Sequence, residues 1–155
     1  MIRWPERYSP GETAVHARAE LEMPFSPETV WPLLVRAELW PIWYPEFQNV
    51  VIEGGGPDLR PGSRFHWKTF GVNLDSEVEE FVPFERLAWT AKSRGVDAYH
   101  AWLIERRPAG CRVLSEETQK GWVARLNNAL RPKSTSRIHQ VWLERLRERA
   151  KNGPP

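Results

Sequence analysis

Residues 97–121, with the sequence DAYHAWLIERRPAGCRVLSEETQKG, form the clearest strand pair in the chain. Side chains of two kinds alternate with period two on both sides of a short segment that contains Pro and Gly, a pattern typical of a β-hairpin. If residues 107–110 form the loop, Arg106 lies opposite Cys111, and this pairing fixes the register of both strands. We therefore expect two long antiparallel strands here.

One face of this expected hairpin mixes polar and apolar side chains. The register places His100 opposite Glu117, Trp102 opposite Ser115 and Ile104 opposite Val113. Facing side chains lie about 4.5–5.5 Å apart at their Cβ atoms, so the register predicts a His100–Glu117 pair. A face that combines such a pair with Trp and Ile is more typical of a pocket wall than of a plain core.

The segments before this hairpin predict further strands that share its apolar face. Residues 63–70, 72–82 and 87–91 alternate in the same way. Pairing residue 70 with residue 73 and residue 82 with residue 87 gives these expected neighbours: Trp67 and Ser76, Phe65 and Val78, and Trp89 and Glu80. Both registers put the apolar side chains on one face, an agreement that a slip of one residue would destroy.

The rest of the chain predicts one arm, two more strands and several helical segments. Residues 1–12 have no sustained period and are expected to form an irregular arm, whereas residues 14–23 alternate as a half-buried strand and residues 49–53 form a short one. A Ser-Pro-Glu helix start at residue 26 predicts two short helices after the first strand. Residues 132–151 carry apolar side chains at steps of three and four, which predicts a long C-terminal helix that includes Trp142.

Length and composition are those of one globular domain. We expect residues 1–155 to fold as a single unit, since 41% of the residues are hydrophobic and 27% are charged. Nine Trp residues supply large side chains that suit either a thick core or an aromatic-lined cavity. This order of strands and helices predicts an α+β fold, in which the last helix lies across a curved antiparallel sheet of about six to seven strands.

Several classes of protein are not expected from this composition. A single cysteine, Cys111, excludes an internal disulfide and a cysteine-rich zinc site. The chain has no signal-like start and no apolar run of bilayer length, so we expect a cytoplasmic protein without membrane insertion. The net charge is +6 over residues 122–155 and −4 over residues 1–121. The basic end is either a solvated helix face, the usual meaning of such a charge run, or a surface for an anionic partner.

The chain resembles the SRPBCC or START-like superfamily, which includes birch-pollen-allergen-type proteins and the polyketide cyclase/dehydrase group. The segments that carry the resemblance are SPETVW at residues 26–31, WPIWYP at 40–45, LRPG at 59–62, VPFERLAW at 82–89 and HAW at 100–102. The resemblance covers roughly residues 14–150 and implies a helix-grip fold around a deep apolar cavity. Members bind lipids, sterols, quinones, hormones or polyketides, only some are enzymes, and the resemblance implies no catalytic residue.

The candidate site lies on the inward face of the expected sheet. Its proposed ligand-binding residues are Phe65, Trp67, Ser76, Val78, Glu80, Trp89, Trp102, Ser115, Gln119 and Trp142. His100 with Glu117 is a candidate acid–base pair, because a carboxylate raises the basicity of an imidazole and fixes its tautomer. The alternatives for this pair are a structural hydrogen bond within a polar patch and a role in orienting a bound ligand. A bulge near Glu80 would turn that side chain to solvent instead.

Three functions remain open at this point. The first is binding of a hydrophobic small molecule, such as a lipid, quinone, aromatic or polyketide-like compound, between the sheet and the last helix. The second is a cyclase or dehydratase that uses His100 as a base, and the third is docking of an anionic partner by the basic C-terminal helix. We expect no cofactor, no metal site, since the four His residues are scattered, and no specific nucleic-acid partner. The oligomeric state stays open.

Overall fold

The computed structural model describes residues 1–153, and within them seven strands form one antiparallel sheet with the order β1-β7-β6-β5-β4-β3-β2. The strands are β1 (Val15–Met23), β2 (Phe47–Ile52), β3 (Arg64–Thr69), β4 (Val72–Val82), β5 (Arg86–Ser93), β6 (Val96–Arg107) and β7 (Gly110–Lys120). The first two strands in the sequence form the two edges of the sheet, so the other strands lie between them. The strand number falls within the range predicted from the alternation.

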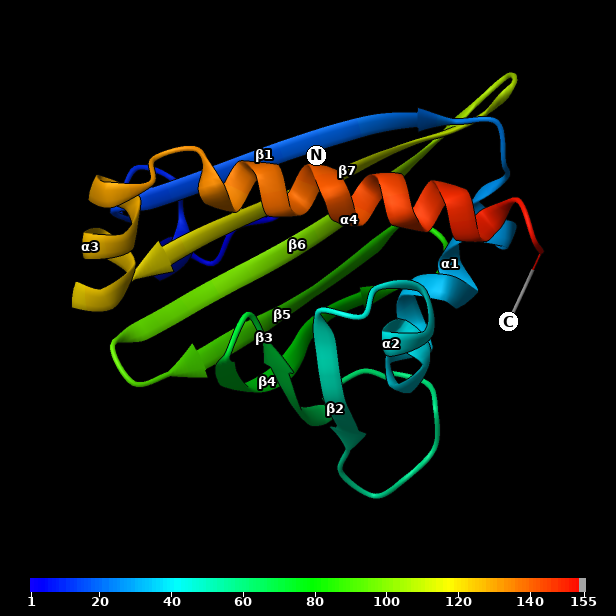
Figure 1. The fold of residues 1–155 in the computed structure, drawn as a ribbon. Coiled ribbons are helices and arrows are strands. Elements are labelled where there is room, and N and C mark those ends of the chain that lie inside the picture. Colours follow the sequence, from blue (N-terminus) through cyan, green and yellow to red (C-terminus); the bar gives the residue numbers. More distant parts are fainter. Residues whose placement is uncertain (154–155) are drawn as a thin grey trace.

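Helices cover one face of this sheet (Figure 1). They are α1 (Pro27–Val35), α2 (Trp40–Trp43), α3 (Trp122–Leu130) and α4 (Ser134–Ala150), with the 3₁₀ turn η2 (Ala37–Leu39) between α1 and α2. A second 3₁₀ turn, η1 (Glu6–Tyr8), lies in the N-terminal arm on the opposite face. The helix α4 crosses the concave face, with α3 at one end of the sheet and α1 and α2 at the other. The α+β helix-grip prediction is confirmed.

The C-terminal helix begins slightly later than predicted. It starts at Ser134 rather than at residue 132, because Pro132 and Lys133 form a turn before it, and it ends at Ala150. Pro154 and Pro155, which follow this helix in the sequence, lie outside the described residues. No helix within residues 1–153 is long and apolar enough to cross a bilayer.

The register predicted for the longest hairpin is confirmed. In β6 and β7, His100 pairs with Glu117 and Arg106 pairs with Cys111. The connecting loop is shorter than expected, since Arg107 and Gly110 also pair and leave only two residues in the turn. Tight two-residue turns set the register of a hairpin, so the paired faces could be read from the sequence.

The register predicted for the β3–β4 hairpin is wrong by two positions. Thr69 pairs with Val72, so Trp67 lies opposite Leu74 and not opposite Ser76. A shift of two residues keeps every side chain on its predicted face, because successive side chains alternate. Trp67 still reaches Ser76 diagonally, and its indole nitrogen donates a 3.0 Å hydrogen bond to the Ser76 hydroxyl.

The pairing of Glu80 with Trp89 is not formed, and the bulge considered as the alternative is present. The β4–β5 register shifts between Val78 and Glu80, so that Trp89 pairs with Val78 and Glu80 pairs with Ala88. Such an irregularity reverses the face of the residues beyond it. Glu80 therefore lies on the convex face, where its carboxylate accepts a 2.8 Å hydrogen bond from Arg86.

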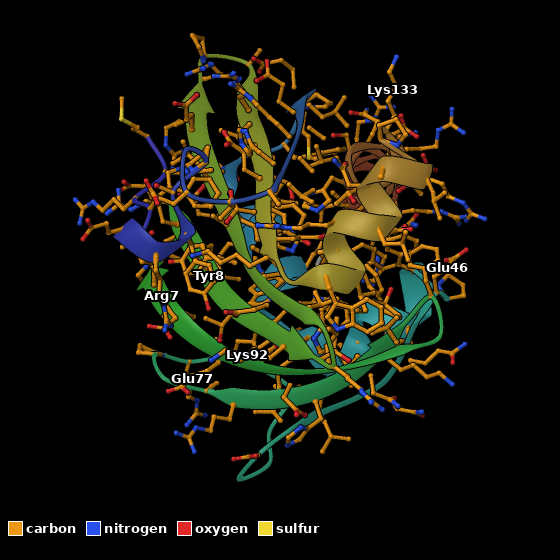
Figure 2. All side chains as sticks on the ribbon, turned by 90° about the vertical axis from the view of Figure 1, so that its left-hand side faces the viewer. Arg7, Tyr8, Glu46, Glu77, Lys92 and Lys133 are labelled. Carbon is orange, nitrogen blue, oxygen red and sulfur yellow. The ribbon has the colours of Figure 1, made fainter. Side chains whose placement is uncertain are left out.

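The two faces of the sheet bury separate apolar clusters. The concave face carries a large aromatic cluster that includes Trp40, Trp89, Trp102 and Trp142. The convex face is covered by the N-terminal arm, whose Tyr8 is fully buried beside the sheet (Figure 2). The Tyr8 hydroxyl donates a 2.6 Å hydrogen bond to Asp97 on β6. The arm is thus irregular as expected, yet firmly packed.

Burial makes the single cysteine unreactive, and this can be measured. Cys111 is fully buried, and desolvation raises the pKa of its thiol from 9.0 to about 11. A rise of about two pKa units lowers the thiolate fraction about 100-fold. We expect native protein at pH 8 to react with a chromogenic disulfide at least about 100-fold more slowly than the urea-unfolded chain. Equal rates in the two states would contradict the buried position of Cys111.

Candidate functional site

A cavity of about 430 Å³ lies between the concave face of the sheet, α3 and the first turns of α4. Its walls come from β2 to β7 on one side and from α3 and α4 on the other, and most of the lining side chains are apolar. Cavities of about 300–1,000 Å³ with apolar walls are typical of small-molecule sites. The long helix and the curved sheet therefore leave room for a ligand at the α3 end of the fold.

The predicted site residues divide into three groups. Those that line the cavity are Trp67, Trp89, His100, Glu117, Gln119 and Trp142. Those that lie in the buried core of the concave side without lining the cavity are Phe65, Ser76, Val78, Trp102 and Ser115. Glu80 alone lies on the convex face. The sequence thus identified the correct face of the sheet, but it did not show which part of that face lines a cavity and which part is filled by the core.

A chain of hydrogen bonds runs through the polar part of the inner wall. The Ser115 hydroxyl oxygen lies 2.8 Å from Nε2 of His100 and 2.8 Å from Nδ1 of His139. Nε2 of His139 then lies 3.1 Å from Oε2 of Glu117. The other carboxylate oxygen of Glu117 accepts a hydrogen bond from Gln119. Side chains from β6, β7 and α4 are joined into one largely buried cluster in this way.

The direct hydrogen bond expected between His100 and Glu117 is not formed. Although the two residues face each other in the sheet, Nδ1 of His100 lies 3.7 Å from Oε2 of Glu117. This distance exceeds the range of a hydrogen bond. Glu117 is hydrogen-bonded to His139 instead, and His100 connects to it only through Ser115 and His139.

His139 is the functional residue that the sequence analysis missed. The expectation that the His residues are scattered is wrong for this pair, because the rings of His100 and His139 lie 4.5 Å apart. The buried residues of α4 are His139, Trp142, Leu143, Leu146 and Ala150. Their spacing is helical, but apolar periodicity does not mark a histidine as buried, so the sequence carried only a weak signal for His139.

Burial keeps His100 uncharged near neutral pH. Desolvation is the main cause that lowers the pKa of His100 well below 6.5, and the nearby His139 lowers it further. Each hydrogen bond in this series has one donor and one acceptor when His139 donates to Glu117, Ser115 donates to His139 and His100 donates to Ser115. In that arrangement Nδ1 of His100 carries a lone pair that faces the carboxylate across 3.7 Å.

Three buried indole groups lack hydrogen-bond partners among the described residues. These are the Nε1–H groups of Trp89, Trp102 and Trp142, of which Trp89 and Trp142 belong to residues that line the cavity. A buried unsatisfied donor costs about 1–3 kcal/mol. The nitrogen atoms of these groups are themselves buried, so they lie within the packed aromatic cluster rather than at the cavity surface.

The helix α3 lies beside the concave side of the sheet (Figure 2) and contributes to the cavity wall. Val123, Ala124 and Asn127 on this helix line the cavity, and Asn127 is also exposed to solvent. The sequence analysis left residues 122–130 as either a short helix or an irregular link. Only their position over the sheet shows that they close one side of the site.

A protein-family model and several solved structures are similar to this chain over most of its length. Residues 14–151 match a family model described as polyketide cyclase / dehydrase and lipid transport. The crystal structure of hypothetical protein jhp0584 from Helicobacter pylori is similar, with a TM-score of 0.90 and 30% sequence identity over 97% of this chain and 96% of that chain.

Two more distant structures share the fold. TTHA0849 from Thermus thermophilus has a TM-score of 0.73 and 20% identity, over 88% of this chain and 97% of that chain. Ara h 8.0201 has a TM-score of 0.64 and 12% identity, over 88% of this chain and 97% of that chain. No curated protein matches the sequence.

Proposed function

Because the chain belongs to the polyketide cyclase/dehydrase and lipid-transport family, we propose that it binds a hydrophobic small molecule in the cavity beneath α3 and α4. The observation that carries the proposal is the cavity of about 430 Å³ with apolar walls and one polar cluster. Apolar walls supply affinity through burial, and a few polar groups fix the orientation of the bound molecule.

The polar groups narrow the class of ligand. Gln119, Glu117 and Asn127 line the cavity and carry side chains that can hydrogen-bond to a bound molecule. A plain alkyl chain offers no acceptor, whereas a quinone or a polyketide-like ring offers carbonyl or hydroxyl oxygens. Flat rings also match the aromatic side chains around the cavity. We therefore place oxygen-bearing ring compounds ahead of simple fatty acyl chains.

The other two hypotheses have less support. His100 is a poor base near neutral pH, because burial lowers its pKa and it does not bond to Glu117 directly. Docking through the basic C-terminal region predicts a filled core, whereas the concave side holds a cavity next to α4. Binding of a small molecule, in contrast, makes use of both the cavity and the polar side chains that line it.

Native mass spectrometry of freshly purified protein, followed by solvent extraction, tests the proposed function. We expect a stoichiometric apolar compound, or a thermal shift with a member of a quinone, polyketide and lipid panel. If the spectrum shows only the bare chain and no panel member shifts the unfolding temperature, the binding proposal fails.

A cavity-filling variant makes the test specific. Ala98 is buried and lines the cavity, so Ala98→Phe should weaken binding of an identified ligand at least about tenfold, or about 1.4 kcal/mol. The variant should keep its thermal stability, because it fills open space rather than overpacking a core. The matched control is Ala129→Phe on the exposed side of α3, which should bind normally. A large loss of stability in Ala98→Phe would mean that the concave side is already filled.

A further inference from the structure

Three metal-ligating side chains converge on the inner wall of the cavity. One ligand atom each from His100, Glu117 and His139 lies within 4.8 Å of the other two. From this convergence we propose that the three residues form a binding site for a divalent transition-metal ion, with Zn²⁺ as the simplest candidate. The proposal does not depend on the organic ligand, since the ion needs only these three side chains and a water molecule.

The distances fit a single ion. Oε2 of Glu117 lies 3.1 Å from Nε2 of His139 and 3.7 Å from Nδ1 of His100. Zinc bonds of about 2.0–2.2 Å place neighbouring ligand atoms of a tetrahedron about 3.3–3.6 Å apart. These two distances bracket this range, and all three ligand atoms lie within 4.8 Å of one another, so an ion can enter after side-chain movements of about 1 Å.

Ser115 holds both imidazole rings in the orientation that the ion requires. Its hydroxyl oxygen lies 2.8 Å from Nε2 of His100 and 2.8 Å from Nδ1 of His139, the nitrogens that point away from Glu117. When the other two nitrogens bind metal, both outer nitrogens carry hydrogen and can donate to the two lone pairs of one hydroxyl oxygen. Outer hydrogen bonds of this kind are a regular feature of metal-binding His residues.

The surroundings of the cluster suit a transition metal rather than Ca²⁺ or Mg²⁺. Two imidazoles and one carboxylate are the ligands preferred by zinc and by neighbouring first-row metals, whereas the alkaline-earth ions prefer oxygen alone. His100 and His139 are each 2% exposed, and the ring of His100 stacks on Trp102 at 5.1 Å. Such packing keeps the rings in place and limits access of water.

The cavity provides the remaining coordination position. His100, Glu117 and His139 all line the cavity, so a water molecule or an oxygen of a bound compound can reach an ion held by them. One carboxylate and two neutral imidazoles leave a net charge of +1 on the proposed centre. It would therefore favour an anionic oxygen, such as an enolate or a carboxylate, as the fourth ligand.

The first test uses the unmodified chain. After dialysis against a chelator, the protein is titrated with Co²⁺ and then with Zn²⁺. We expect one equivalent of Co²⁺ to give visible absorption bands that Zn²⁺ removes. In ¹⁵N spectra, Zn²⁺ should shift the imidazole signals of His100 and His139 and leave those of His16 and His66 unchanged. No uptake of either ion, or shifts confined to His16 and His66, would overturn the proposal.

Variants separate this site from adventitious binding at the surface. Ser115→Ala should keep one equivalent but bind it about 10–100-fold more weakly, as expected for loss of a supporting hydrogen bond, and Glu117→Gln should weaken it further. The control is His66→Gln, since His66 is an exposed histidine that also contacts two carboxylates, those of Asp75 and Glu53. Loss of uptake in His66→Gln with normal uptake in Glu117→Gln would overturn the proposal.

Stability and ligand controls keep these outcomes distinct. Thermal unfolding without metal shows whether each variant is folded. If a variant is not folded, the imidazole spectra of the unmodified chain alone test the metal proposal. Ala98→Phe should lose the apolar ligand but still bind one equivalent of metal. The organic-ligand and metal proposals can therefore fail separately.

Discussion

Replacing Trp40 with Ala should lower the free energy of unfolding by about 3–5 kcal/mol, the range measured for large aromatic residues removed from a core. Trp40 is fully buried on α2, and five other aromatic rings lie 5.4–6.0 Å from its ring. Its indole nitrogen also donates a 3.1 Å hydrogen bond to the carbonyl of Leu34. The variant loses burial, ring contacts and this bond together.

The matched control lies two residues away on the same short helix. Ile42 is 72% exposed, so Ile42→Ala should change the free energy of unfolding by no more than about 0.5 kcal/mol. Urea unfolding of the two variants and the parent chain measures both values. A loss below about 1 kcal/mol for Trp40→Ala would show that the aromatic cluster does not hold α2 against the sheet.

The second large effect is expected at the tip of the longest hairpin, where Gly110→Ala should cost about 2–5 kcal/mol. Gly110 has a φ of +144°, which L side chains rarely adopt, and a Cβ atom there would lie 2.0 Å from the carbonyl oxygen of Met23. That oxygen belongs to the backbone of β1, so it cannot move without disturbing the strand pair β1–β7.

Gly71→Ala separates the two causes of this effect. Gly71 also lies at a tight hairpin turn and has a φ of +79°, but a Cβ atom there would meet nothing within 4 Å. It should therefore cost only the backbone strain of about 1–2 kcal/mol. Denaturant unfolding of both variants gives the comparison. If Gly110→Ala is no more destabilising than Gly71→Ala, the close approach to β1 has no energetic consequence.

The proposed binding site depends on the same aromatic cluster that these stability predictions address. Trp142 lines the cavity and lies 5.4 Å from Trp40 and 5.0 Å from His100, measured between ring centroids. The aromatic cluster thus extends from the packed core around Trp40 to the wall of the cavity. Stability variants should be chosen on the filled side, since changes at Trp142 affect both folding and the cavity.

The faces of the sheet could be predicted from the sequence because alternation is a local property of an extended chain. The apolar side chains of the β6–β7 hairpin face the side that period two assigns to them, and a tight turn sets the pairing of His100 with Glu117. Even the two-position error in the β3–β4 register left Trp67 on the correct face. The family resemblance led to the same fold.

Only the tertiary structure decided which of these residues meet. Glu80 changed face because the β4–β5 register shifts beside it, and such a shift depends on how neighbouring strands pack. His139 joined the cluster because the rotation of α4 about its axis is set by what the helix packs against, not by its own periodicity. The open part of the concave side likewise follows from where α3 and α4 lie over the sheet, because chain segments distant in sequence determine that volume together.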